Sequence, residues 1–297
     1  MRMPSEEALV ACLYTQVHSN FQAAFGGIIS GPEHLAQMTM DALNPVRAFE
    51  QLTALQTRVG QDLAGRRLLE VGCGHGLTVA LARTEFGAEA YGIEPGESEF
   101  AGALGISRKV LEMSGLSKSI IMPACGEAIP FRDNWFDLVF SSNGLEHVHD
   151  PQLVIDESIR VLKPGGCLDV VVPNYGSWWE GHYGLVWLPN MPPAVAKLYV
   201  RILGRDPRFI DTLRFINYRW LKRILSKHQG RVEVLGWGVD LWEARLRTLD
   251  FSEWSTLGKL KRLLNWVHKL RAVEIVASAG KLLHWQTPLV LSLRKVH

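Results

Sequence analysis

Three glycines and one acid form the part of the sequence with the clearest chemical potential. Gly72, Gly74 and Gly76 follow the apolar residues Leu68, Leu69 and Val71, and Glu94 stands eighteen residues after Gly76. A turn without side chains lets backbone N–H groups approach a ligand and lets the next helix begin without a clash. A carboxylate after a second strand can accept two hydrogen bonds from a ribose diol. The pattern therefore predicts a nucleoside-binding site.

Two histidines, His147 and His182, follow later predicted strands and are the candidate catalytic residues. An imidazole can take a proton from the hydroxyl group of a substrate because its unperturbed pKa is about 6.5. The alternative is a structural role, such as a hydrogen bond from His147 to the backbone. Aromatic residues around His182 are expected to line an acceptor pocket, although they are equally good core residues: Tyr175, Trp178, Trp179 and Tyr183.

Apolar runs predict the elements that must hold these residues. They indicate four strands, at Leu68–Val71, Ala88–Ile93, Phe136–Asn143 and Cys167–Val172. A helix over Leu77–Phe86, closed by Gly87, joins the first two strands, and a further helix ends at Lys163 because Pro164 cannot continue it. Gly165 and Gly166 are expected to reverse the chain before the last of these strands.

The glycine spacing separates two kinds of nucleoside site. A dinucleotide fingerprint reads G-x-G-x-x-G, but here the third glycine comes one residue early, in Glu70-x-Gly72-x-Gly74-x-Gly76. This run resembles motif I of class I S-adenosylmethionine-dependent methyltransferases. The segment Leu68–Pro173 resembles the methyltransferase core that includes the ubiquinone-type O-methyltransferases. The resemblance implies an α/β fold, with a Rossmann-like doubly wound seven-stranded sheet, an antiparallel last strand and helical cap insertions.

The resemblance also implies a cofactor, S-adenosyl-L-methionine, and residues that bind it. Glu94 matches the ribose acid, and Gly126-Glu127-Ala128 matches the loop beside the adenine. Cys125 stands where many relatives have an Asp that binds the adenine amino group, so Glu127 or a backbone carbonyl would replace it. The full set of expected cofactor residues is Glu70, Gly72, Gly74, Gly76, Glu94, Glu127 and Asn143.

A metal is not expected. Some relatives bind a divalent cation through E-x-x-E-H, but this chain reads Asn143-x-x-Glu146-His147. Asn143 is neutral and a weaker ligand, although His149 or His182 could join the remaining pair. We expect Glu146 and His147 to form a hydrogen-bonded pair at the start of a helix.

Charge and tryptophan divide the chain into three parts. Residues 1–60, with a helix over Pro45–Gly60, are expected to form an N-terminal helical cover, and residues 61–183 the S-adenosylmethionine-binding core. Residues 184–297 carry a net charge of +12 and seven of the ten tryptophans. They are expected to form a basic helical cap plus the last two core strands. The expected elements of this part are helices Pro192–Gly204 and Asp211–His228 and strands Arg231–Trp237 and Thr287–Val296.

The basic cap suggests its partners. Lys259, Lys261 and Arg262 alternate with leucines, as in a helix that lies on a lipid surface, although a solvated charged face is equally compatible. We expect a small-molecule acceptor that is anionic or lipid-linked, with peripheral membrane contact. Nucleic acid is not expected, because no binding motif is present and the total charge is near neutral.

Cysteine usage and the N-terminus point to the cytoplasm as the expected location. The four cysteines form no C-x-x-C pair, Glu6 and Glu7 precede a short apolar run unlike a signal peptide, and no stretch reaches a membrane span. The expected function is O-methylation of a sugar, quinone or lipid-linked intermediate. The alternatives are N- or C-methylation on the same fold, or a non-catalytic S-adenosylmethionine-binding subunit.

Overall fold

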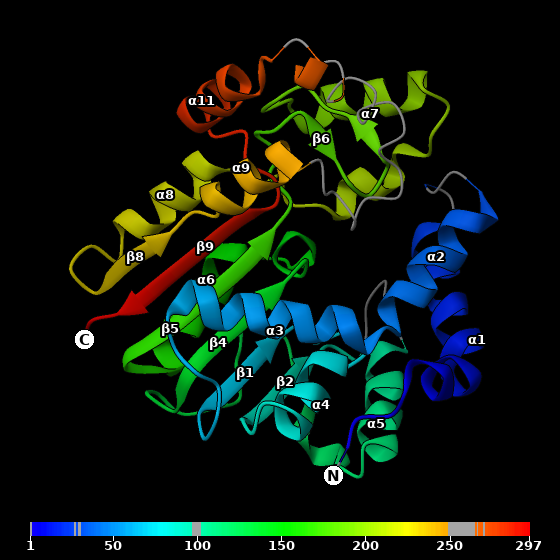
Figure 1. Ribbon diagram of the computed structural model, residues 1–297, viewed down its shortest axis with the longest axis vertical. Coiled ribbons are helices and arrows are strands. Elements are labelled where there is room, and N and C mark those ends of the chain that lie inside the picture. Colours follow the sequence, from blue (N-terminus) through cyan, green and yellow to red (C-terminus); the bar gives the residue numbers. More distant parts are fainter. Residues whose placement is uncertain are drawn as a thin grey trace.

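The computed structural model describes residues 2–26, 28, 31–96, 102–248, 265, 267–269 and 271–297. A seven-stranded sheet with the order β3-β2-β1-β4-β5-β9-β8 lies at its centre, and β6 and β7 form a separate two-stranded sheet (Figure 1). The strands are β1 (Arg67–Val71), β2 (Glu89–Glu94), β3 (Ile121–Pro123), β4 (Phe136–Ser142), β5 (Leu162–Val172), β6 (Trp179–Glu180), β7 (Leu185–Val186), β8 (Val232–Gly236) and β9 (Leu289–Lys295).

Helices cover both faces of the central sheet (Figure 1). The α-helices are α1 (Glu6–Phe25), α2 (Pro32–Ala42), α3 (Pro45–Val59), α4 (Leu77–Thr84), α5 (Ala103–Met113), α6 (Pro151–Val161), α7 (Pro193–Ile202), α8 (Tyr218–Ser226), α9 (Val239–Thr248) and α11 (Val273–Leu283). Short 3-10 helices are η1 (Lys118–Ile120), η2 (Leu145–His147) and η3 (Pro207–Thr212).

The sheet confirms the predicted doubly wound fold. Strands β1 to β5 pair in parallel, whereas β9 runs antiparallel to both of its neighbours, β5 and β8. Successive side chains of a strand point to opposite faces, so Leu68 packs beneath α3 and α4 while Leu69 packs against α6 and α8. Because the first five strands are parallel, their carboxyl ends meet at one edge of the sheet.

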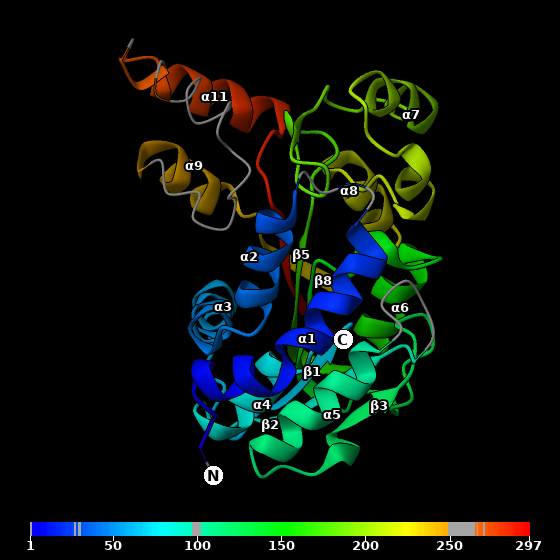
Figure 2. The same cartoon turned by 90° about the vertical axis from the view of Figure 1, so that its right-hand side faces the viewer.

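A cap lies over those carboxyl ends (Figures 1 and 2). It contains the β6–β7 hairpin, α7 and η3, which share an aromatic core around Trp187, Tyr175 and Phe209. Phe25 and Ile28, at the end of the N-terminal helix α1, belong to the same core. The cap therefore rests on both the sheet and α1.

Several elements differ from their predicted bounds. The expected helix Asp211–His228 begins only at Tyr218, because the side chain of Asn217 accepts the Trp220 N–H and starts the helix there. The aromatic segment around His182, in which the sequence predicts no strand, contains β6. The first part of β5 reaches back to Leu162, with an irregular pairing to β4 across residues 163–166 in place of a free reversal.

Other outcomes concern helix ends and the basic segment. Helix α4 ends at Thr84, two residues before the predicted Phe86. Helix α3 ends as predicted, at a left-handed Gly60. The predicted interfacial helix around Lys259 and Arg262 lies outside the described residues.

Candidate active site

The glycine turn follows β1 and contains one position that opens onto free space. The φ angles of Gly72, Gly74 and Gly76 are 72°, 50° and 76°, in the left-handed region that favours glycine. A Cβ on Gly76 would lie 2.7 Å from Ile121 Cδ1, so this glycine is required by packing. A Cβ on Gly74 would meet no atom within 4 Å. Gly74 therefore borders space that a ligand can fill.

Two buried acids flank this turn, as the sequence predicted. The Gly74 N–H donates to Glu94 Oε2 at 2.8 Å. Burial raises the pKa of Glu94 to about 7, against the effect of that hydrogen bond. Burial likewise raises the pKa of Glu70 to about 8, although a hydrogen bond with Thr78 opposes the shift. Ionising either carboxyl therefore costs free energy unless further hydrogen-bond donors are supplied.

The other two predicted cofactor residues lie in neighbouring turns. Asn143, directly after β4, is exposed with a φ of 52°, and its N–H donates to Val171 O at 2.8 Å. Glu127 Oε1 accepts the backbone N–H groups of His149 and Asp150, at 2.8 and 3.2 Å. One oxygen of Glu127 thus anchors the start of α6.

A fully buried carboxylate, Glu146, lies between the two predicted catalytic histidines. Its Oε1 is 3.8 Å from His147 Nε2 and 3.9 Å from His182 Nε2. Within the described part of the chain neither carboxylate oxygen has a hydrogen-bond partner. The expected Glu146–His147 hydrogen bond is therefore wrong, because the short helix η2 leaves the two groups too far apart. Burial raises the pKa of Glu146 to about 7, in spite of the opposing charge of His182.

His182 is held by a second buried carboxylate, Glu180. Their Nδ1···Oε1 distance is 2.6 Å, and Glu180 Oε2 also accepts the Tyr183 N–H at 2.7 Å. Burial alone would raise the pKa of Glu180, but His182 and the backbone donors hold it below its usual range. An ionised Glu180 assigns the proton of His182 to Nδ1. The Nε2 atom, 3.9 Å from Glu146 Oε1, is then the unprotonated nitrogen of the ring.

The two histidines differ in basicity. Burial, together with the neighbouring charge of His182, lowers the pKa of His147 to about 3. His147 therefore stays neutral at physiological pH and is a poor proton acceptor. The carboxylate partner at His182 instead favours the imidazolium that proton uptake would create. Of the two predicted catalytic residues, His182 has the better surroundings for a base.

Aromatic side chains of α1 connect the histidines with the glycine turn. Phe25 stacks on His182 with ring centroids 6.5 Å apart, and Phe209 lies 5.4 Å from the same imidazole. One turn earlier, Phe21 lies 5.8 Å from Phe25 and 5.4 Å from His75, which stands between Gly74 and Gly76. The N-terminal helix thus spans the distance from the glycine turn to the histidines.

The predicted pocket tyrosines belong to the cap core. Tyr175 stacks on Phe215 with ring centroids 4.3 Å apart, and its hydroxyl reaches Glu180 at 3.4 Å. The Tyr183 hydroxyl donates to Asp206 O at 2.7 Å. Both rings are almost completely buried. The structure therefore gives these residues a packing role beside the histidine cluster.

The two predicted pocket tryptophans separate. Trp179, on β6, is buried. Trp178 is exposed and packs edge-to-face against Trp285, with ring centroids 5.5 Å apart. Only Trp179 therefore lies on the inner side of the hairpin that carries Glu180.

Glu180 is absent from the predicted catalytic pair, although it ends β6 and precedes His182 by two positions. This closeness in sequence is a local signal that the carboxylate could pair with the imidazole. No local sequence pattern indicates how far Glu146 lies from the two histidines.

The same cluster has the composition of a metal site. One carboxylate oxygen of Glu146 and one nitrogen each of His147 and His182 lie within 4.8 Å of one another. The sequence argued against a metal because Asn143 replaces an acidic ligand. The structure supplies His182, from beyond β5, as a different third donor.

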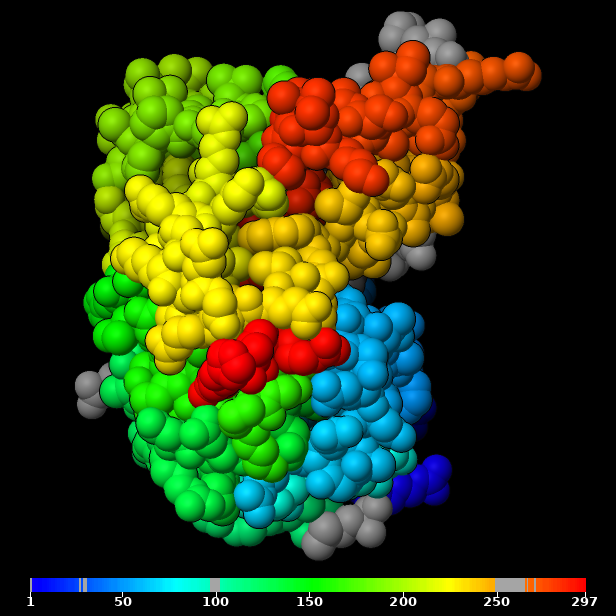
Figure 3. Space-filling view, turned by 90° about the vertical axis from the view of Figure 1, so that its left-hand side faces the viewer, coloured from blue at the N-terminus to red at the C-terminus, as the bar shows by residue number. Residues whose placement is uncertain are grey.

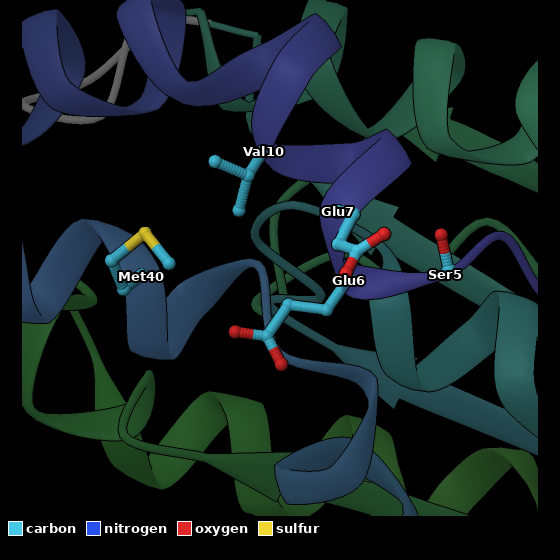
Figure 4. Close-up of a pocket in the computed structure, with 5 residues that line it drawn as sticks. All are labelled: Ser5, Glu6, Glu7, Val10 and Met40. Carbon is cyan, nitrogen blue, oxygen red and sulfur yellow. The ribbon is translucent and has the colours of Figure 1, made fainter.

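A hollow of about 560 Å³ lies elsewhere, between the first turns of α1 and Met40 of α2 (Figure 4). Ser5, Glu6, Glu7 and Val10 form its other walls. None of the predicted site residues lines this hollow, and neither the glycine turn nor the two histidines borders it. We therefore place the active site at the carboxyl ends of the strands.

The core of this chain is similar to known methyltransferases. Residues 69–169 match the family model described as a methyltransferase domain. An uncharacterized methyltransferase of Mycolicibacterium vanbaalenii is 34% identical over 157 residues, which cover 52% of this chain and 57% of the relative. A ubiquinone biosynthesis O-methyltransferase of Xylella fastidiosa is 33% identical over 168 residues, covering 54% and 63%. The chain therefore spans less than two thirds of the length of these relatives.

A solved structure extends the likeness beyond the core. The phosphoethanolamine N-methyltransferase 2 of Haemonchus contortus superposes with a TM-score of 0.53 at 20% identity, over 97% of this chain and 59% of that one. At this identity the likeness concerns the fold. Residues 69–169, with their glycine turn and strand order, form a methyltransferase domain of the class I S-adenosylmethionine-dependent type.

Proposed function

We propose that this protein transfers the methyl group of S-adenosylmethionine to an oxygen atom of a small-molecule acceptor. The observation that carries the proposal is the pair formed by Glu180 and His182, which leaves a basic nitrogen beside the carboxyl ends of the strands. An alcohol or phenol needs such a base, because its oxygen becomes a good nucleophile only as its proton leaves. The O-methyltransferase relative supports the same choice of atom.

The cofactor would lie across the glycine turn. S-adenosylmethionine would supply an electrophilic methyl group, so the protein's tasks are to align and desolvate the acceptor and to remove its proton. The space above Gly74 accepts the cofactor, and Glu94 binds its ribose hydroxyls. Glu70, Gly72 and Gly76 shape the turn. Glu127 and Asn143, in the adjoining loops, complete the proposed contacts.

His182 would act as the base. Its Nε2 would take the hydroxyl proton of the substrate, and Glu180 would stabilise the resulting imidazolium across the 2.6 Å contact at Nδ1. Phe25 and Phe209 exclude water from the imidazole. Glu146 and neutral His147 offer polar atoms on the opposite side, where they orient the acceptor hydroxyl.

The acceptor belongs to the class of sugars, quinones or lipid-linked intermediates, with an anionic group favoured by the basic cap. Nitrogen or carbon as the methylated atom is the alternative, and a non-catalytic cofactor-binding subunit is the third possibility. The open space at Gly74 supports ligand binding over a purely structural role.

Mass spectrometry of cell extract incubated with the protein and isotope-labelled S-adenosylmethionine tests the proposal. We expect a labelled product with a new O-methyl group. His182→Ala should keep cofactor affinity while losing about 10²–10⁴ in turnover. His149→Ala is the matched control, since His149 is exposed on the turn after His147. A labelled nitrogen or carbon, or full turnover by His182→Ala, would contradict the proposal.

A second role for the cluster rests on one observation, the close approach of Glu146, His147 and His182. Two imidazoles and a carboxylate suit a divalent transition metal with open coordination positions. In that case the cation, rather than a base, would stabilise the deprotonated oxygen of the methyl acceptor. Metal analysis of the purified protein and turnover after chelation distinguish the two roles.

A further inference from the structure

Helix α7 is apolar on both of its sides. Its inner side packs Ala196 and Val200 into the cap core. Its outer side presents Val195, Leu198 and Ile202, at the i, i+3 and i+7 spacing of one helical face. Leu198 is 56% exposed and Ile202 is 73% exposed. A helix at an ordinary protein–water boundary carries polar residues on its outer side, so this face has the character of a contact surface.

Helix α11 repeats the arrangement. Its inner side packs closely on α9, because a Cβ on Gly280 would lie 1.9 Å from the Trp242 ring. Ile275 and Leu282, seven residues apart on the outer side, are 72% and 79% exposed. Two separate helices therefore expose large apolar side chains that their own packing does not require.

Both helices lie at the same end of the molecule, beyond the carboxyl ends of the strands (Figures 1 and 2). The space-filling view shows the chain around α7 and α11 forming that end together (Figure 3). We call the exposed apolar residues of this end the cap face. Its members are Val186, Leu188, Val195, Leu198, Ile202, Leu203, Ile275, Leu282 and Leu283.

The charges that accompany the cap face are positive. Arg201 of α7, Arg271 before α11 and Lys281 of α11 are exposed. None of the three forms an ion pair with any other described residue. Three acids close to these cations in sequence are already paired: Asp206 with Arg208, Asp211 with Lys197, and Glu274 with Arg247. The cap face therefore combines apolar side chains with uncompensated cations.

We propose that the cap face binds the surface of an anionic lipid bilayer. Apolar side chains on one face, with cations beside them, suit the boundary between acyl chains and anionic headgroups. A second copy of the chain fits less well, because a two-fold contact through this face would bring the cations of the two copies together. Among the described helices, none is long and apolar enough to cross a bilayer.

Binding in this orientation would turn the end of the molecule that holds the active site toward the lipid. An acceptor dissolved in the bilayer could then reach the histidine cluster without crossing bulk water. This consequence rests on the proposed function, whereas the lipid contact itself does not.

Vesicle co-sedimentation tests the contact without any acceptor. The full-length protein is mixed with phosphatidylcholine vesicles, with or without phosphatidylglycerol, at low and high salt. We expect binding to the anionic vesicles that weakens with salt, because exposed charges are screened within about 8 Å at physiological ionic strength. Equal binding to neutral and anionic vesicles, or none to either, would overturn the proposal.

Variants separate the apolar and charged contributions. Leu198→Asp/Ile202→Asp should reduce binding at least about tenfold, since it removes buried apolar area and adds repulsion. Arg201→Glu/Arg271→Glu/Lys281→Glu should reduce it about 10²-fold or more, at roughly fivefold per cation. Val46→Asp is the matched control, because Val46 is 59% exposed on α3.

Two further measurements keep the result interpretable. All variants should bind S-adenosylhomocysteine as the unmodified protein does, which shows that they fold and keep the cofactor site. Sedimentation velocity without vesicles should show no change of mass in Leu198→Asp/Ile202→Asp. A dimer that this variant dissociates, with no vesicle binding by the unmodified protein, would assign the cap face to self-association and refute the lipid contact.

Discussion

Replacing Glu146 by glutamine should change how the stability of the protein depends on pH. Glu146 is fully buried, and neither of its oxygens is hydrogen bonded among the described residues. Its pKa rises from 4.5 to about 7 in the folded protein. A group with a raised folded pKa gives its full stabilisation below the unfolded pKa and loses it as the pH rises through the folded pKa. The window for this loss is therefore about pH 4.5 to 7.

The size of the effect follows from the shift. At 1.36 kcal/mol per pKa unit, ionising Glu146 in the folded state costs about 3 kcal/mol. Glutamine has the same shape and cannot ionise. The buried acids Glu70 and Glu94 contribute equally to both proteins and cancel in the comparison.

Urea unfolding at pH 5 and pH 8, after chelation of metals, measures this difference. The unmodified protein should lose about 2–3 kcal/mol more than Glu146→Gln between the two pH values, because pH 5 lies slightly above the unfolded pKa. Glu50→Gln, an exposed change on α3, should leave the pH dependence unaltered. Identical pH dependence in Glu146→Gln would refute the reasoning. A loss of stability on substitution at pH 8 would show instead that the native carboxylate is ionised and paired.

Three other results are expected. Gly74→Ala should fold with a strain of about 1 kcal/mol, and calorimetry should show a loss of cofactor affinity. Gly76→Ala should instead lower the melting temperature, because its Cβ would lie 2.7 Å from Ile121 Cδ1. Normal affinity in Gly74→Ala would show that the cofactor does not bind at this turn. Glu180→Gln should lower turnover about 10- to 100-fold and move the acidic limb of the pH–rate profile to lower pH, because the imidazolium of His182 loses its anionic partner; an unshifted profile would reduce Glu180 to a packing role. Chelation should leave turnover unchanged if the base mechanism holds, and a loss restored by zinc or manganese would assign the cluster to a metal.

The core strands could be predicted because they are buried on both faces. Parallel strands of this kind are nearly continuous apolar runs, so β1, β2 and β4 stand within one residue of their predicted bounds. The glycine turn could be predicted equally well, because its three positive φ angles depend on local residue types.

The helix predicted from Asp211 shows where periodicity misleads. Leu213 and Ile216 are buried, as the apolar pattern required. They are buried in irregular chain, however, because Asn217 supplies a cap that starts the helix later. An apolar period reports burial, and an N-cap inside the pattern decides where the helix begins.

The active-site cluster could be predicted only in part. His147 and His182 were both chosen, because each follows a strand whose carboxyl end faces the cofactor. Their distances from Glu146 depend on how the β6–β7 hairpin packs over the sheet, which no local pattern specifies. The same packing places Tyr175 and Tyr183 in the cap core rather than in an open pocket.

The hairpin that carries Glu180 has a mechanical consequence. The base and the carboxylate that orients it are two residues apart on one segment, so a displacement of the cap moves them as a unit and leaves their 2.6 Å contact intact. Glu146 and His147 are attached to the sheet through β4. The distance between His182 Nε2 and Glu146 Oε1, now 3.9 Å, would therefore change if the cap opened. A probe of that distance would report cap motion directly.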